Sequence, residues 1–209
     1  SEAQRGPLDL VYGVDGDEGA MTVRHVDDQP SEAWHVPAGA SVMTVVDDQL
    51  LVQRAGRLYL LQRGGGVREY AIGDFMGSRG GWVLWRGCDE QMRCRLNIGT
   101  AQQPVVHSHE RDDWEMWANG FGVGLAPDGA SVVATRPGQV RPALVRLEDG
   151  VSLVDVDLET QIDWTPDGEW AFVRLPGDRV VGVSTRDGRQ VPINLPFRFD
   201  AQQVALAVG

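Results

Sequence analysis

Short apolar runs separated by turn residues follow one another along the whole chain, and the clearest of them form a repeat. Within residues 121–196 the same order of runs and turns occurs twice. In each copy a Pro-Asp-Gly turn, at 127–129 or 166–168, separates two apolar runs, and a second turn, at 148–150 or 186–188, separates two more. Apolar runs joined by Asp-Gly turns are typical of antiparallel hairpins. Each copy therefore predicts a four-stranded antiparallel sheet.

The rest of the chain divides into similar units. A first unit has three expected strands, at 8–14, 20–26 and 33–36. A second unit has four, at 41–46, 49–55, 57–63 and 67–72, and a third has four, at 75–79, 81–87, 94–100 and 103–108. In the first copy of the repeat, residues 121–126 are expected as the innermost strand. One further strand, Gln203–Val208, has no partner in its own neighbourhood. No stretch longer than about two turns has helical periodicity.

Three strands at the start and one at the end together make one complete sheet. We therefore predict an all-β, five-bladed β-propeller with four-stranded antiparallel blades, in which Gln203–Val208 completes blade one beside Leu8–Val14. The blades are expected, within one domain of residues 1–209, at 8–39 with 200–209, 40–73, 74–113, 114–159 and 160–199. Such closure removes the open sheet edges that invite aggregation. A fragment of a larger propeller is the alternative.

The two copies resemble the repeat of the WD40-like, TolB-type propeller family, whose hallmark is a Trp-Ser-Pro-Asp-Gly run followed by apolar residues and Phe. The second copy keeps Trp164, the Pro-Asp-Gly turn and Phe172, with Thr165 in the serine position. The first copy has Leu125 and Ala126 in place of Trp and Ser. The resemblance covers about a third of the chain. It implies a propeller scaffold for binding proteins or ligands and carries over no catalytic residue.

Composition narrows the classes of partner. The formal net charge is −11, and all 19 basic residues are arginine. A surface of this charge disfavours nucleic acid, because counterion release from phosphates needs a basic face. No apolar run approaches the ~20 residues that a membrane-spanning helix needs. A signal peptide or anchor upstream of Ser1 is compatible with this sequence. No cofactor is expected.

The two cysteines, Cys88 and Cys94, flank a short polar segment between two apolar strands. Facing positions across a hairpin can meet the spacing that a disulfide needs. A disulfide here would place the chain in an oxidising, extracytoplasmic compartment, as a secreted, periplasmic or membrane-anchored ectodomain. The alternative is a pair of free thiols in a cytosolic protein. A metal site would need further ligands that the neighbouring sequence lacks.

Candidate binding residues gather in the third unit and in the segment that follows it. We expect residues 107–117 to form a long irregular segment, where a rigid scaffold commonly carries its binding groups. His107 and His109 are weak candidates for a divalent metal, and Trp114 and Trp117 form either an aromatic platform or packing between blades. The ligand- or partner-binding candidates are His107, His109, Glu110, Asp112, Asp113, Trp114, Trp117, Asp89 and Glu90. The alternative for the acids is a set of solvated surface carboxylates.

The function that these features favour is a non-catalytic extracytoplasmic binding module. In this interpretation the chain is the ectodomain of a bacterial envelope protein whose loop face holds a protein partner. A carbohydrate-binding, lectin-like propeller is the first alternative. A glycoside hydrolase is the second, but its two opposed carboxylates on inner strands are poorly matched, since only Asp163 and Asp74 supply one. No catalytic residue is assigned.

Overall fold

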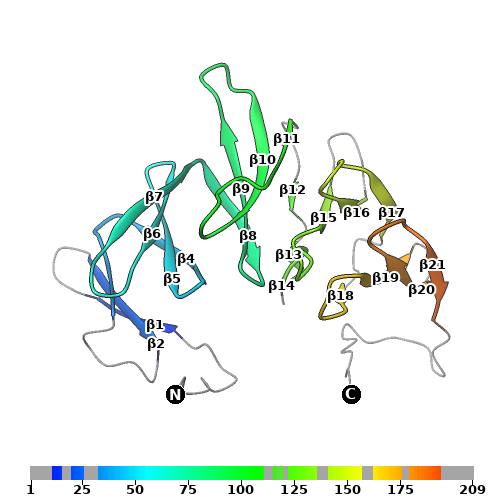
Figure 1. The fold of residues 1–209 in the computed structure, drawn as a ribbon, viewed down its shortest axis with the longest axis horizontal. Helices are drawn as coiled ribbons and strands as arrows, with labels where there is room; N and C mark the ends of the chain where they lie inside the picture. Colours follow the sequence, from blue (N-terminus) through cyan, green and yellow to red (C-terminus); the bar gives the residue numbers. More distant parts are fainter. Residues whose placement is uncertain are drawn as a thin grey trace. The chain divides into compact units, whose positions relative to one another are not determined.

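The regular structure of the described chain is entirely β-strand. The computed structural model describes residues 11–15, 20–25, 33–110, 115–116, 118–119, 122–135, 141–156, 162–175 and 179–193. The chain divides into two compact units, residues 1–75 and 76–209, and each is described by itself. Figure 1 shows the strands of each sheet as neighbouring antiparallel segments of the chain. The prediction of an all-β chain built from short antiparallel sheets is confirmed.

The described residues of the first unit form two sheets. In order of pairing, the three-stranded sheet consists of β1 (Val11–Asp15), β2 (Met21–His25) and β3 (Trp34–Val36). The four-stranded sheet consists of β4 (Ser41–Val46), β5 (Gln49–Arg54), β6 (Arg57–Leu61) and β7 (Val67–Ile72). Side chains of both sheets share one apolar cluster, in which Trp34, Leu50 and Leu61 are buried. The alternating apolar positions of the sequence therefore place their side chains between the two sheets.

Two very short turns fix the register of the second sheet. Asp47 and Asp48 (φ 47° and 61°) connect β4 to β5, and Ala55 and Gly56 (φ 50° and 71°) connect β5 to β6. Two positive φ angles in succession are the geometry of the hairpin turn whose twist matches that of the flanking strands. These turns lie in the gaps between the strands predicted at 41–46, 49–55 and 57–63, except that Ala55 belongs to the turn and not to the strand.

The described residues from Asp74 onward form three four-stranded sheets and one small hairpin. The first sheet has the order β11 (His107–Glu110), β10 (Cys94–Thr100), β9 (Trp82–Cys88) and β8 (Asp74–Arg79). The second has the order β12 (Glu115–Met116), β15 (Ser131–Thr135), β16 (Ala143–Arg146) and β17 (Ser152–Asp155). The third has the order β18 (Asp163–Trp164), β19 (Trp170–Leu175), β20 (Arg179–Ser184) and β21 (Gln190–Pro192). The hairpin pairs β13 (Ala118–Asn119) with β14 (Gly122–Val123).

The prediction of a continuous innermost strand at residues 121–126 is wrong. The position beside β15 is shared by β12 and by Leu125, which makes an isolated bridge to Val132. Between them the chain forms the β13–β14 hairpin. The backbone N–H of Val133 donates to the carbonyl of Gly124 (2.6 Å), so the interrupted strand resumes its pairing there. The pattern of apolar residues identified where the strand lies. It did not reveal the inserted hairpin, because the hairpin residues have no apolar alternation of their own.

The turns of the two sequence copies have the same hydrogen bonds. Gly129 N–H donates to the carbonyl of Ala126 (3.0 Å), and Gly168 N–H donates to that of Thr165 (2.9 Å). Both glycines have a left-handed backbone, at φ 72° and 75°, which glycine adopts without steric cost. The preceding aspartates accept the N–H two residues on, from Ala130 in the first copy (2.9 Å) and from Glu169 in the second (3.0 Å). The Asp-Gly pairs therefore determine the turn geometry locally.

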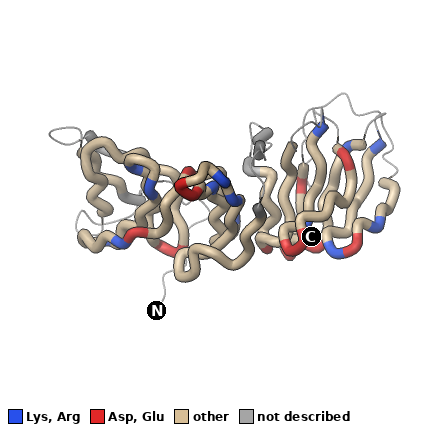
Figure 2. Tube along the Cα trace, turned by 90° about the horizontal axis from the view of Figure 1, so that it is seen from above, with Lys and Arg blue, Asp and Glu red and all other residues tan. Residues whose placement is uncertain are grey.

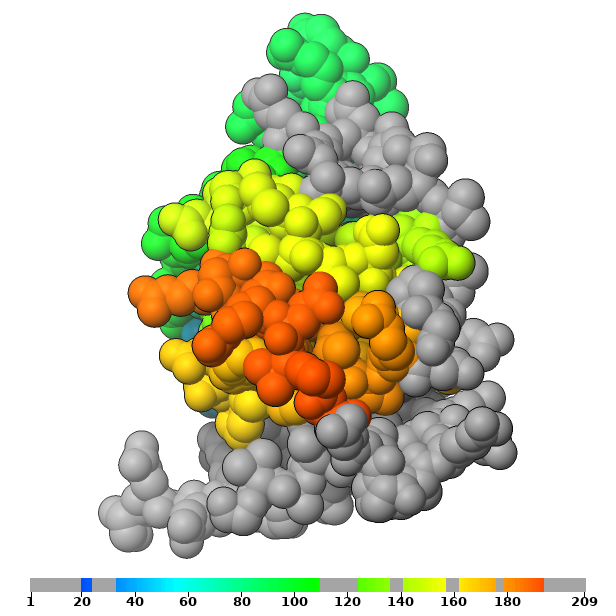
Figure 3. Space-filling view, turned by 90° about the vertical axis from the view of Figure 1, so that its right-hand side faces the viewer, coloured from blue at the N-terminus to red at the C-terminus, as the bar shows by residue number. Residues whose placement is uncertain are grey.

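Consecutive sheets of the second unit pack face to face. One apolar cluster joins β9 and β10 to β15 and β16, through buried Leu84, Ile98, Val132 and Val145. Another cluster joins β15 and β16 to β18, β19 and β20. Figure 3 shows the orange atoms of the third sheet directly against the yellow atoms of the second. Four-stranded sheets packed face to face are the arrangement of neighbouring blades in a propeller.

The turn glycines lie at these contacts between sheets. A Cβ added to Gly129 would come within 2.3 Å of the Trp82 ring, and one added to Gly168 within 2.4 Å of the Asp128 carboxyl carbon. Each Pro-Asp-Gly turn therefore rests against the preceding sheet. Gln203–Val208, predicted to complete the first sheet, lies outside the described residues, and the five-blade count and the closure of the ring stay predictions.

Candidate functional site

The hairpin of β9 and β10 carries the cysteines at its open end. The two strands pair in register from Trp82 opposite Thr100 to Cys88 opposite Cys94. Cys88 and Cys94 are joined by a disulfide, with 3.9 Å between their Cα atoms. The predicted disulfide is confirmed. Figure 1 shows the hairpin extending past the end of β11, and in Figure 3 its green tip projects at the top of the view. We call residues 88–94 the hairpin tip.

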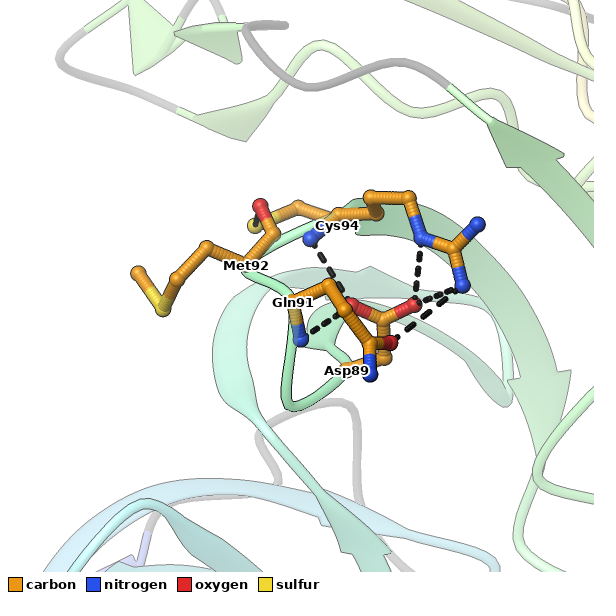
Figure 4. A network of polar contacts seen from close by, with 5 residues as sticks. Asp89, Gln91, Met92 and Cys94 are labelled. Carbon is orange, nitrogen blue, oxygen red and sulfur yellow. Dashed lines mark hydrogen bonds and ion pairs between the residues drawn. The ribbon is translucent and has the colours of Figure 1, made fainter.

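The backbone of the hairpin tip is held by Asp89 (Figure 4). Its backbone N–H donates to the carbonyl of Arg93 (3.0 Å), and its own carbonyl accepts from the N–H of Met92 (2.9 Å). Its carboxylate oxygen Oδ1 accepts from the N–H groups of Gln91 (3.0 Å) and Arg93 (2.9 Å). The N–H groups of Asp89, Gln91, Met92 and Arg93 therefore have partners within the tip, and these hydrogen bonds hold its backbone.

An ion pair completes this network. Arg93 donates from Nε and Nη2 to Oδ2 of Asp89, each at 2.8 Å. The hydrogen bond from the backbone N–H of Arg93 is the largest cause that lowers the pKa of Asp89, and the Arg93 guanidinium and the Gln91 N–H lower it further. Asp89 therefore keeps its negative charge, and with it these bonds, into the acidic range. Figure 2 shows acidic and basic residues side by side at this hairpin.

The tip exposes side chains that take no part in holding it together. Met92 is 76% exposed, and its backbone has a left-handed φ of 61°. Glu90 is exposed next to Asp89. Sequence reasoning singled out Asp89 and Glu90 here but missed Met92 and Arg93. The available signal was Met92 itself, an apolar residue between the polar residues Gln91 and Arg93 in a turn.

Residues 107–110 do not belong to an irregular segment, which corrects the prediction for 107–117. They form strand β11, with Ile98 opposite His107 and Arg95 opposite Glu110. The hydroxyl of Ser108 donates to Oδ1 of Asn97 across the pair (2.7 Å). The strand forms through this pairing with β10, and only its first two residues fall within the strand predicted at 103–108.

The first part of the strand predicted at 103–108 is a loop. The indole N–H of Trp85 donates to the carbonyl of Pro104 (2.9 Å), and Val106 N–H donates to the carbonyl of Ile98 (2.7 Å). Pro104 has no N–H to give to a strand ladder. The loop at 101–106 therefore lies back against the hairpin, and β11 starts only at His107.

The structure brings some of the candidate residues together. Because Arg95 pairs with Glu110, the end of β11 lies beside the start of β10, directly after the hairpin tip. His107 and His109 share one face of β11, as alternate positions of a strand do. The backbone of Glu110 lies at the end of β11. The positions of Asp112, Asp113, Trp114 and Trp117 lie outside the described residues, so their predicted roles stay predictions.

The inner-strand carboxylates weighed for glycoside hydrolysis have structural partners. Asp74 accepts a hydrogen bond from the side-chain amide of Gln53 (2.9 Å), whose carbonyl oxygen accepts from the N–H of Phe75 (3.0 Å). Asp163 accepts from the N–H of Trp164 (2.9 Å). Each carboxylate thus helps to fix the start of its own strand. Across the part of the chain that is described, no group of three or more His, Cys, Asp or Glu side chains is placed to hold a metal ion.

Comparisons with known proteins find structural likenesses only. No family model matches the chain, and no curated protein matches it. The structure is similar to Hsv2 from Kluyveromyces marxianus, with a TM-score of 0.49 and 14% identity, covering 82% of this chain and 55% of that one. It is similar to BamB from Moraxella catarrhalis, with a TM-score of 0.44 and 12% identity, covering 91% and 62%.

A third likeness is to apo AztD from Citrobacter koseri, with a TM-score of 0.41 and 12% identity, covering 89% of this chain and 59% of that one. All three proteins are β-propellers. The chain spans between 55% and 62% of their lengths. Likenesses of this distance assign neither an activity nor a partner to the chain. No helix among the described residues has the length and apolar character to cross a membrane.

Proposed function

We propose that this chain is a non-catalytic, extracytoplasmic binding module of propeller type. It binds a protein partner at the end of its sheets from which the hairpin tip projects. The setting that we propose is the ectodomain of a bacterial envelope protein. The observation that carries the proposal is the hairpin tip itself, closed by a disulfide and held by the Asp89 network. A protruding loop with a fixed conformation loses little entropy on binding, which favours recognition of a partner.

The disulfide supports the compartment. Disulfides persist in oxidising environments and are rare where glutathione and thioredoxin keep thiols reduced. Both cysteines of the chain are consumed in this bond. The net charge of −11 supports a partner that is basic or neutral and disfavours nucleic acid.

The alternatives have less support among the described residues. The lectin-like alternative depends on Trp114 and Trp117, which lie outside them. The glycoside hydrolase alternative depends on Asp163 and Asp74, whose hydrogen bonds serve their own strands. A protein partner is therefore the function that the described geometry supports best.

Photocrosslinking in the cells that make the protein tests the proposal. A photoreactive amino acid replaces Glu90 at the hairpin tip in one variant and Val191, which is 45% exposed on β21, in the matched control. The proposal predicts a discrete protease-sensitive adduct at position 90 and none at position 191. Equal labelling at both positions, or none at position 90, would contradict it. A glycan-array signal abolished by Trp114→Ala and Trp117→Ala would favour the lectin-like alternative.

A further inference from the structure

The hairpin tip displays an apolar side chain where the backbone does not favour one. Met92 has φ 61°, a conformation that costs an L-residue roughly 1 kcal/mol and that Gly or Asn adopts more readily. The other described non-glycine residues with positive φ are Asp47, Asp48 and Ala55, which lie in two-residue turns that require it. Met92 is the last residue of the three-residue hairpin loop 90–92, and a loop of this length also places a left-handed residue at that position. What needs an explanation is therefore that an exposed methionine occupies a position that Gly or Asn fills at lower cost.

The network of the tip fixes the position of Met92 but not its side chain. Its N–H donates to the carbonyl of Asp89 (2.9 Å), and the next residue, Arg93, is held by Asp89 through backbone and side chain. The disulfide closes the loop two residues away. With 76% of Met92 exposed, its thioether stem lies in solvent and contributes little to folding. Met92 is thus presented from a backbone that binding does not have to order.

The charge around Met92 indicates the chemistry of the complementary surface. Arg93 neutralises Asp89 within the tip, whereas Glu90 is exposed beside it. The chain as a whole carries a formal charge of −11. An apolar side chain next to an acidic one fits an apolar pocket with a basic rim, since opposite potentials across an interface favour association.

We propose that Met92 is the anchor residue of the hairpin tip, which inserts into an apolar pocket on a protein partner whose rim carries arginine or lysine opposite Glu90. The inference rests on the proposed function and names the chemistry of its partner. Met suits this role because its flexible, polarisable side chain adapts to an apolar pocket. A buried apolar anchor surrounded by weaker polar contacts is the usual energetic organisation of a protein interface.

The experiment selects binders from a random-sequence peptide library displayed on phage, against the purified, disulfide-bonded chain. The enriched peptides are expected to combine a large apolar residue with neighbouring arginine or lysine. Met92→Asn is expected to weaken their binding about tenfold or more, the loss of a hot-spot side chain. Asn is chosen because it tolerates the left-handed backbone, so the tip keeps its conformation. Unchanged resistance of the variant's cysteines to alkylation verifies that the tip is still closed.

Two matched variants isolate the contribution of the Met92 side chain, and a third tests the charge of Glu90. Met92→Leu keeps an apolar anchor and is expected to bind within about threefold of the unmodified chain. Val191→Asn removes an exposed apolar side chain from β21 and is expected to leave binding unchanged. Glu90→Gln is expected to weaken binding at low salt and to reduce its salt dependence.

The possible outcomes distinguish a failure of the Met92 anchor from a failure of the proposed function. Peptides that bind Met92→Asn as tightly as the unmodified chain overturn the anchor and leave a protein-binding module. A library that yields no binder contradicts the proposed function itself. Enriched peptides with acidic residues refute the basic rim. A self-associated chain that becomes monomeric in Met92→Asn also overturns the proposal, because the occupant would then be a second copy.

Discussion

At the scale of single residues, ionised aspartates in the turns hold the turn backbone through hydrogen bonds. Asp149 is the strongest case. Arg146 donates to both of its carboxylate oxygens and also to the carbonyl of Arg186 in the next sheet. The side-chain hydrogen bond from Arg146 is the largest cause that lowers the pKa of Asp149 to about 2, and the N–H of Val151 lowers it further. The Asp149 carboxylate thus orders its own turn and positions Arg146, which reaches the turn at Arg186 in the third sheet.

This arrangement predicts a pH-dependent stability. Because the pKa of Asp149 is lower in the folded chain, about 2 against an ordinary value of about 3.9, its ionised form stabilises the fold above the ordinary value. That contribution is lost as pH falls from about 4 towards about 2. Thermal unfolding of the unmodified chain and of Asp149→Asn should therefore differ at neutral pH and converge in this acidic range. Asp155→Asn, on neighbouring β17, is the control for removal of a charge. A difference that stays constant down to pH 2 would refute the role of Asp149.

At the scale of elements, the repeated turns have a second role, which is to fit one sheet against the next. Gly129 and Gly188 both have left-handed backbones, at φ 72° and 73°. A Cβ at Gly129 would come within 2.3 Å of Trp82, whereas one at Gly188 would meet only ordinary contacts at 3.6 Å from Leu153. The two positions therefore share the backbone requirement and differ in how closely the sheets approach.

Alanine at these two positions separates backbone strain from sheet packing. Gly188→Ala is expected to lower the free energy of unfolding by about 1 kcal/mol, the cost of a left-handed L-residue. Gly129→Ala is expected to lower it by about 3 kcal/mol, because the clash with Trp82 adds to that cost. Urea unfolding of both variants measures the difference. Equal losses would mean that the turn does not hold the two sheets at this distance.

The elements that sequence could predict are those determined by local signals. The Asp-Gly turns, the two-residue turns at Asp47 and Ala55, and the facing cysteines depend on neighbours in the chain. Strand β11 depends instead on pairing with β10, so only its first two residues, His107 and Ser108, were expected in a strand. The β13–β14 hairpin interrupts a strand without altering its apolar pattern. Met92 was missed because its significance lies in its backbone angle and exposure, which the residue type does not reveal.

At the scale of the whole molecule, the open question is how the first sheet is completed. Strand β1 has β2 on one side, and among the described residues no strand pairs with its other side. The pattern of the sequence assigns that place to Gln203–Val208, which would turn a three-stranded sheet into one of four strands. An unpaired edge would favour association between chains, so the partner of β1 matters for solubility as well as for shape.

Deleting residues 203–209 tests this assignment. The shortened chain is expected to exchange the amide hydrogens of β1 faster and to unfold at a lower temperature, because β1 would lose one ladder of hydrogen bonds. Deleting residues 1–7, to which no strand is assigned, is the control. Unchanged exchange in β1 after the C-terminal deletion would refute the closure.

The central claim of extracytoplasmic binding depends on a hairpin tip that is closed by its disulfide in the cell. The most direct measurement is the mass of the chain isolated from the cells that make it, after thiol alkylation with and without prior reduction. We predict no added label before reduction and two labels after it, one on Cys88 and one on Cys94. Two labels before reduction would show free thiols and would contradict both the oxidising compartment and the preorganised tip.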